Sequence, residues 1–264
     1  MGNPVRRNRN IGTKKQGHGQ NNRLTIHDWC KSSSDSRAFY ERLGKYRKEK
    51  HTINGHEFVF VLEETTAGFC HVCSVADVVY ILSHLPASDY GELKWVIFRQ
   101  PKRKEVILEP VWGRLLYSYE FEGAYFPAII LEAVDLNSSI RWRRKLVLDD
   151  QVEMQRLIAD GHEFTADKRG LRANMTAKYA RATQLYRTLP HELGHYVQYL
   201  QVVGPSEYPE DDAAYELAMQ QEEERYEQYC QIPTAEKEKF AHRYADEFKA
   251  KLEAEHLIPF APLV

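Results

Sequence analysis

The chain has 264 residues, 43% of them hydrophobic and 28% charged, and its formal net charge is -2. A chain of this length and balance can bury a full-sized core, so we expect a globular protein. The near-neutral charge excludes whole-chain electrostatic attraction as a basis for binding nucleic acid or a membrane surface.

Residues 1–24 are rich in Asn, Gly, Arg and Gln, and their charged side chains are all basic. With so few apolar side chains this segment cannot form a core, and we expect a basic disordered tail. We expect no nucleic-acid partner except through this tail. The remaining residues, 25–264, are predicted to form a single domain.

The residues after the basic N-terminus indicate the compartment. They are polar where a signal peptide would have an apolar core, and no window approaches the roughly eighteen apolar residues of a spanning helix. Four cysteines are too few for a disulfide framework in a chain of this size. We therefore expect a soluble, cytoplasmic protein without a membrane partner.

The first structured part is predicted to be rich in β-strands over residues 55–135. It is preceded by a short polar helix, predicted from Asp35 to about Lys50. The segment 56–62 is β-rich and predicts a strand, whereas 74–85 has helical spacing and stops at a proline.

Cys70 and Cys73, between these two elements, have the spacing of zinc ligands. A structural tetrahedral site needs four ligands, however, and no second pair with suitable spacing is available. Packed thiols at a junction between a strand and a helix are the favoured interpretation.

Further strands are predicted over 94–99 and 105–109, as a hairpin, and over 114–121 and 124–134. Pro127 has no N–H to donate and indicates that the last of these strands begins at an edge. Together these strands predict a small, mostly antiparallel sheet.

The pattern changes to helix from Asp149 onward, giving a helical part over 149–256. Helices are predicted over 149–159, 174–188, 188–203, 210–229 and 234–255. The fold class expected from this order is α+β, a small sheet followed by a helical half.

The segment Thr188–Gly204 contains His-Glu-Leu-Gly-His, the H-E-x-x-H pattern. On a helix, His191 and His195 lie one turn apart on one face and can bind one Zn²⁺, while Glu192 projects beside them toward a metal-bound water. Apolar residues recur at helical spacing through this segment, Thr188 can cap it, and Gly204 ends it.

A catalytic zinc normally takes a third protein ligand. A metzincin site is excluded because Gln198 and Gln201 stand where that class has Gly and His. Glutamates on later helices remain as candidates, as does His242 in a three-histidine site. The glutamates considered are Glu216, Glu222, Glu223 and Glu224 on an acidic helix, and Glu238 on the last helix.

The last helix contains Glu238-Lys-Phe-Ala-His-Arg-Tyr-Ala245, with the spacing E-x-x-A-x-x-[FY]-A. In this respect the chain resembles the compact gluzincins, including the ImmA/IrrE-like metallopeptidases. The resemblance implies a zincin-like fold with Glu238 as the third zinc ligand, Glu192 as general base, and an edge strand, here the one containing Tyr125 to Val134, that aligns a peptide or protein substrate.

The function expected on this basis is that of a zinc-dependent peptidase. Two other functions stay open. One is a binding module for a macromolecule whose zinc site is structural or vestigial, and the other is a zinc hydrolase that acts on a non-peptide amide.

Overall fold

The computed structural model describes residues 41–102, 111–168, 170–204, 209 and 211–263. The predicted basic tail at 1–24 and the predicted strand at 105–109 lie outside this part. Residues Leu43–Val264 form one compact unit with strands and helices in the same core, which confirms the expected α+β class.

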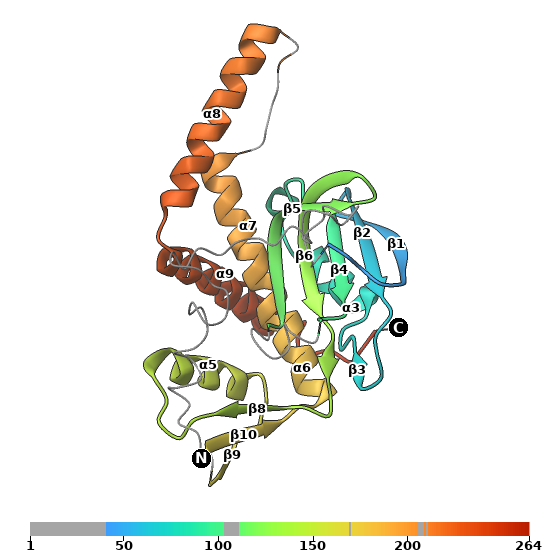
Figure 1. Ribbon diagram of the computed structural model, residues 1–264, viewed down its shortest axis with the longest axis vertical. Helices are drawn as coiled ribbons and strands as arrows, with labels where there is room; N and C mark the ends of the chain where they lie inside the picture. The colour runs from blue at the N-terminus through green and yellow to red at the C-terminus, as the bar shows by residue number, and fades with distance from the viewer. Residues whose placement is uncertain (1–40, 103–110, 169, 205–208, 210, 264) are drawn as a thin grey trace, which may run out of the picture. The chain divides into compact units, whose positions relative to one another are not determined.

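The central sheet has five strands in the order β1-β2-β4-β6-β5 (Figure 1). They are β1 (Tyr46–Ile53), β2 (His56–Glu63), β4 (Trp95–Arg99), β6 (Ala124–Glu132) and β5 (Gly113–Phe121). The middle strand β4 pairs in parallel with β2 and β6, and the two outer pairs are antiparallel. This sheet is therefore mixed, and not mostly antiparallel as predicted. Every residue of β4 is buried, as is usual for a strand with parallel neighbours on both sides.

The edge next to the helices is formed by β5, not by β6 as predicted. Pro127 misled the prediction, because its missing N–H is tolerated for another reason. The ladder passes from Leu116 opposite Ala128 to Tyr119 opposite Phe126, so two residues of β5 lie opposite the proline in a β-bulge. A bulge interrupts the ladder hydrogen bonds, which lets a proline stand in an internal strand.

The helix predicted from Asp35 to about Lys50 is wrong over its last residues, since β1 begins at Tyr46. The first part of that range, 35–40, lies outside the described residues. Lys48, Glu49 and Lys50 are good helix formers, but here they stand on the outer edge strand of the sheet. Charged side chains are common on edge strands because they prevent pairing with other chains.

The other elements fall into helices and two small sheets. The helices are α3 (Val75–Ser83), η2 (Ala87–Asp89), α5 (Leu148–Ala159), α6 (Ala177–Thr183), η3 (Gln184–Thr188), α7 (Leu189–Val203), α8 (Asp212–Gln231) and α9 (Thr234–Ala254). The small sheets pair β3 (Phe69–Cys70) with β7 (Val134–Asp135), and β8 (Ser139–Trp142) with β10 (Gly170–Asn174) and β9 (Thr165–Asp167). The predicted helices over 74–85, 149–159, 188–203, 210–229 and 234–255 are confirmed to within a few residues.

Thr188 does not cap α7 as predicted. Its backbone is already helical, and α6, the π-helical turn η3 and α7 form one continuous run. Pro190 explains the π turn, because a proline inside a helix cannot donate to the carbonyl four residues earlier and its ring collides with it. A wider turn just before the proline accommodates this, and such turns are frequent at functional sites.

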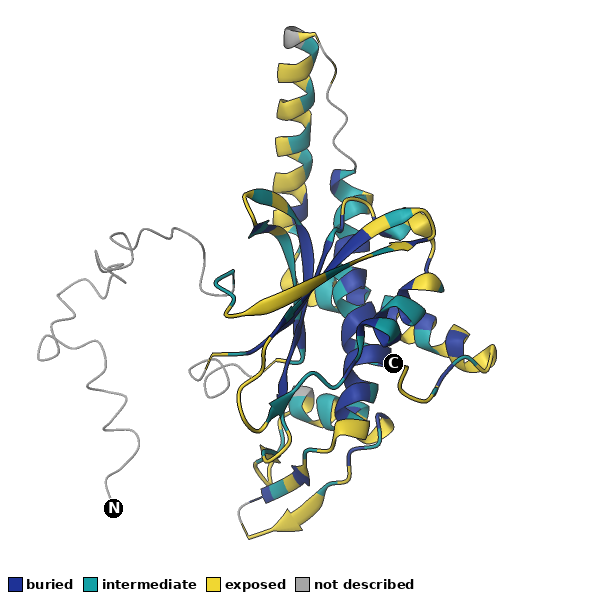
Figure 2. Cartoon of the chain, turned by 90° about the vertical axis from the view of Figure 1, so that its right-hand side faces the viewer, coloured by how far each residue is buried: buried dark blue, intermediate teal, exposed yellow. Residues whose placement is uncertain are grey.

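One face of the central sheet carries the core. Alternate side chains of β2, β4 and β6 pack there against α3, η3, α7 and the end of α9. Figure 2 shows the resulting contrast between α7, which is largely buried, and α8, which is mostly exposed. Within the described residues, no helix has the length and apolar character needed to cross a membrane.

Candidate metal centre and active site

The two histidines of the H-E-x-x-H pattern lie side by side on α7. His191 Nε2 and His195 Nε2 are 3.1 Å apart, and both rings are largely buried. One helical turn separates the two residues, so their side chains leave the helix on the same face. This geometry agrees with the spacing argument from the sequence.

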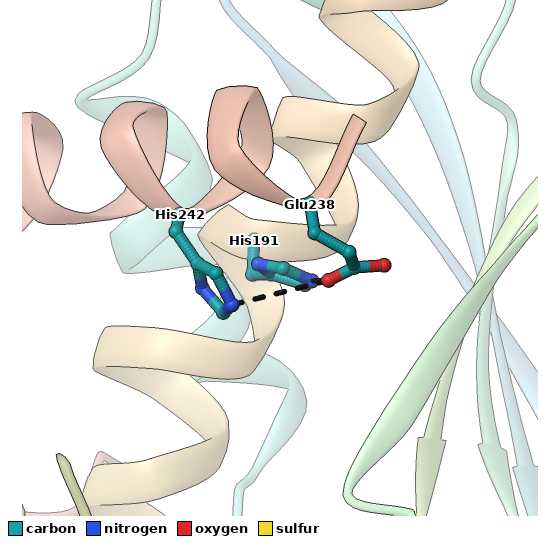
Figure 3. A group of neighbouring side chains, drawn as sticks. All are labelled: His191, Glu238 and His242. Atoms are coloured by element: carbon teal, nitrogen blue, oxygen red, sulfur yellow. Dashed lines mark ion pairs between the residues drawn. The ribbon is translucent and has the colours of Figure 1, made fainter. Parts of the chain in front are cut away.

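Glu238 reaches these histidines from α9. One of its carboxylate oxygens is 3.4 Å from His191 Nε2 and the other is 3.5 Å from His195 Nε2. Figure 3 shows the carboxylate directed at His191, from a helix that crosses α7. The structure therefore brings together the three residues that the sequence nominated as ligands.

These separations match what one zinc ion requires. Ligand atoms at about 2.0–2.2 Å from a zinc ion with tetrahedral angles are about 3.3–3.6 Å from one another. The separation of the two nitrogens is 3.1 Å, and each nitrogen is 3.4 or 3.5 Å from one of the two Glu238 oxygens, which is close to this range. Two imidazole nitrogens and a carboxylate are also ligand types that zinc prefers. The types and separations of these three side chains fit a zinc ion.

His242 is another candidate metal ligand, and it lies beside His191 and Glu238. It lies one turn after Glu238 on α9, and its Nε2 is 3.9 Å from a Glu238 oxygen. Suitable ligand atoms of His191, Glu238 and His242 all lie within 4.8 Å of one another (Figure 3). On distance alone, this set can also hold a metal.

The position of Arg156 distinguishes the set that contains His195 from the set that contains His242. Its Nη1 lies 2.7 Å from His242 Nε2. Because an arginine only donates, Nε2 must accept this hydrogen bond, and its lone pair points at Arg156 and not at a metal. Burial, together with the positive charges nearby, lowers the pKa of His242 to about 4. The contact with Arg156 therefore favours His195 over His242 as the candidate partner of His191 in holding a metal.

Glu192 stands next to the ligands and is held by the edge strand. The backbone N–H of Leu115 on β5 donates to Glu192 Oε2 over 2.8 Å. Burial raises the pKa of Glu192, while the two histidines and the Leu115 N–H oppose that shift. An oriented carboxylate with a raised pKa beside a metal site is suited to accept a proton.

The opposite shift applies to Glu238. Hydrogen bonds from His191 and His195 hold its pKa well below the usual range, although burial opposes them. The Glu238 carboxylate is therefore ionised at neutral pH. An ionised oxygen is the form that binds a metal, so the two carboxylates of the site have different properties suited to different tasks.

The rival glutamates of α8 do not join this group. Glu216, Glu223 and Glu224 are exposed, and Glu222 is half-buried. The cysteines are also separate from it, since Cys73 Sγ is buried 3.6 Å from Gln184 Oε1. Among the described residues, neither the α8 glutamates nor the cysteines belong to a set of side chains spaced to hold a metal.

A cavity of about 690 Å³ borders the centre. It is lined by His191, Glu192, Glu238 and His242, and also by residues at the start of β5 and in β8. Its volume is in the range of sites that enclose small ligands. The candidate centre thus borders a space that can hold part of a substrate.

Two parts of the site could not be found from the sequence. Arg156 shows no motif, and its contact with His242 joins residues 86 positions apart. The Leu115 N–H is a backbone group, which no residue pattern reveals. Gly194, by contrast, can be noticed in the sequence. A glycine inside a helix lowers the stability of the helix by about 1 kcal/mol relative to alanine, so its presence indicates a close contact with another element.

Comparison with known proteins adds no relative. No family model matches the chain, and no match is found among curated proteins or among solved structures.

Proposed function

We propose that this protein is a zinc-dependent peptidase in which His191, His195 and Glu238 hold the metal. The observation that carries the proposal is the convergence of these three side chains at separations close to those of zinc ligands. Catalytic zinc sites keep a fourth position open, whereas structural sites fill it with a fourth protein ligand.

Glu192 supplies the proton transfer. A zinc ion held there would polarise the scissile carbonyl and would make a water molecule more acidic. Glu192 would accept a proton from the attacking water as its oxygen bonds to the carbonyl carbon, and would pass that proton to the amine nitrogen as the C–N bond breaks. The Leu115 N–H fixes one oxygen of Glu192, which orients the carboxylate for this task.

A peptide is the substrate that the surroundings favour. The strand β5 is an edge of the central sheet and contacts α7, where the Leu115 N–H on its outer side already donates to Glu192. An extended peptide can add to such an edge through main-chain hydrogen bonds. This role belongs to β5, since β6 is paired on both sides.

A second function rests on His242. If His242 turned from Arg156 to the metal, four protein ligands would surround the zinc and close the site. The protein would then be a zinc-stabilised binding module. The 3.9 Å between His242 Nε2 and Glu238 is the observation that favours this alternative.

The test combines metal analysis with hydrolysis. Zinc-loaded protein is expected to contain about one equivalent of zinc and to hydrolyse a mixture of peptides, with the products identified by mass spectrometry. Glu192→Gln should keep the zinc and lower hydrolysis by about a hundredfold or more, because only the base is removed.

The matched control is Glu247→Gln, at an exposed position of α9. It should change neither zinc content nor hydrolysis. Full hydrolysis by Glu192→Gln would refute the mechanism. A wild-type protein that is inactive on all peptides, and whose zinc has four protein ligands by X-ray absorption, would favour the binding module.

A further inference from the structure

Three tyrosines pack together one helical turn beyond His195, the last metal ligand of α7. Tyr199 follows His195 by four residues, so it lies about 6 Å further along the helix. Its ring packs against Tyr117 of β5 and Tyr229 of α8, with centroids 4.9 and 5.3 Å away. Side chains from three elements therefore meet at this point.

Two tyrosines of this group, Tyr117 and Tyr229, are joined by a hydrogen bond. Tyr117 OH and Tyr229 OH are 2.5 Å apart and share a hydrogen bond. This bond links the edge strand to the C-terminal end of α8, which packs beside α7 (Figure 1). We call Tyr117, Tyr199 and Tyr229 the tyrosine bridge.

Tyr229 is also held from a third side. It is only 3% exposed, and the ammonium group of Lys237 on α9 lies 4.1 Å from the centre of its ring. Contacts with β5, α7 and α9 thus hold one side chain of α8. A side chain with packing on all these sides keeps one position and acts as a fixed wall.

The cavity at the centre lies on the other side. It is lined by His191 and Glu192 together with Gly113 and Thr188, and none of the described residues that line it belongs to the tyrosine bridge. The tyrosine bridge and the cavity therefore lie on different sides of the centre. A chain bound across the centre can continue through the cavity but meets a wall in the other direction.

The distance to this wall limits how much chain fits. Leu115 donates to Glu192, and Tyr117 is two residues further along β5, which is at most about 7 Å because the bulge at Tyr117 shortens the regular rise of a strand. A peptide strand beside β5 has the same rise, so about two residues fit between the centre and the bridge. Only the end of a chain has so few residues.

The direction of β5 indicates which end this is. Antiparallel pairing is slightly more stable per residue than parallel pairing. A strand added antiparallel to β5 has its carboxyl end beside Gly113 and its amino end beside Tyr117. Building on the proposed peptidase function, we infer that the protein is an exopeptidase that removes one or two residues from the amino terminus of its substrate.

The first experiment changes the position of the amino terminus of the substrate. Zinc-loaded wild-type protein is incubated with a ten-residue peptide and with the same peptide extended by four residues at its amino end. We expect the cut to stay one or two residues from whichever amino terminus is present. A cut at the same internal bond in both peptides, or near the carboxyl terminus, would overturn the inference while leaving the peptidase function intact.

The second experiment does not depend on hydrolysis. Peptides that end in a hydroxamate, a zinc-binding group, are prepared with one, two or five residues on the amino side, and their Kd values for the zinc-loaded protein are measured by calorimetry. The five-residue compound should bind at least tenfold more weakly than the two-residue compound. Equal affinity would show that the tyrosine bridge does not block the chain and would overturn the inference, even if no peptide is hydrolysed.

Variants of the bridge complete the test. Tyr229→Ala should remove the penalty on the five-residue compound, whereas Tyr226→Ala, at an exposed position one turn earlier on α8, should keep it. Tyr229→Phe retains the ring and should also keep most of the penalty, which separates blockage from a general loss of structure. A penalty that survives Tyr229→Ala in a folded protein would contradict the assignment of Tyr229 as the wall.

Discussion

Gly194 of α7 lies directly against Ala241 of α9. A Cβ atom built at Gly194 would be 2.9 Å from the Cα of Ala241 and 3.1 Å from its carbonyl oxygen, closer than side chains tolerate. Both residues are adjacent to the metal centre in sequence, since Gly194 precedes His195 and Ala241 precedes His242. This contact lets the two helices approach closely enough for Glu238 to face the histidines.

We predict that Gly194→Ala weakens zinc binding by about tenfold or more. Alanine favours the helix by about 1 kcal/mol over glycine, but the added methyl group must push α9 away from α7. The displacement moves Glu238 while leaving both histidines in place. Competition with a chromogenic chelator measures the zinc affinity. Unchanged affinity would show that the helix contact does not position the carboxylate.

A pair of variants on α9 provides the control for this prediction. Ala241→Val adds two methyl groups at the buried contact, whereas Ala250→Val adds them at an exposed position of the same helix. The first is expected to reduce zinc affinity at least as much as Gly194→Ala. The second should change it by less than about twofold, because valine lowers only the helix propensity there.

Glu238 itself gives the second prediction. Glu238→Gln should lower zinc affinity by about tenfold or more, because a neutral amide oxygen replaces an ionised ligand. Glu247→Gln on the same helix, and Glu222→Ala on α8, should leave the affinity nearly unchanged. Retention of zinc by Glu238→Gln, together with its loss in Glu222→Ala, would assign the third ligand to the acidic helix.

Much of this site could be predicted from the sequence because its signals are local. His191, Glu192 and His195 are neighbours on one helix, and helical periodicity alone places them on one face. Glu238 could be nominated because its segment resembles the ligand helix of the compact gluzincins, and Ala241 and Ala245 of that segment are buried in the structure.

The parts that could not be predicted depend on contacts between distant segments. The residues of β4 indicate a buried strand, but its parallel pairing with β2 and β6 depends on partners about 35 residues away on each side. The bulge opposite Pro127 and the contact between Arg156 and His242 are also tertiary features. Local spacing carries no information on which distant segment a side chain or strand will meet.

His242 gives the third prediction. His242→Ala should reduce zinc affinity by less than about threefold, whereas His195→Ala should reduce it by a hundredfold or more, because the Nε2 of His242 accepts from Arg156 and is not free to bind the metal. Zinc titration of both variants measures the difference. Equal losses would place His242 among the ligands and support the closed site.

The last prediction concerns the stability of the fold behind the site. Asp77 of α3 accepts two hydrogen bonds from Arg181, over 2.7 and 2.9 Å, and one from the backbone N–H of Leu263. It also caps its own helix through the N–H of Ser74. The Asp77 side chain is 1% exposed, so this ion pair is almost wholly removed from water.

Removing one partner leaves the other charge buried without compensation, which costs about 3–5 kcal/mol. Asp77→Asn keeps the shape of the side chain and should lower the free energy of unfolding by about this amount. Glu57→Gln, in the exposed pair with Lys50, should change it by less than about 1 kcal/mol. Urea denaturation of the metal-free proteins, followed by circular dichroism, measures both.

The effect of Asp77 should depend on pH in one direction. Burial alone would raise the pKa of Asp77, but the hydrogen bonds from Arg181, Leu263 and Ser74 outweigh burial and lower it. A lowered pKa in the folded state means that the stabilisation is complete above the ordinary pKa of an aspartate. It is lost as the pH falls through that value toward the lower pKa of the folded state. The difference in unfolding free energy between wild-type and Asp77→Asn protein should therefore be constant near neutral pH and shrink in acid. A difference that grows as the pH falls would show that Asp77 is protonated in the folded protein and that the ion pair does not form.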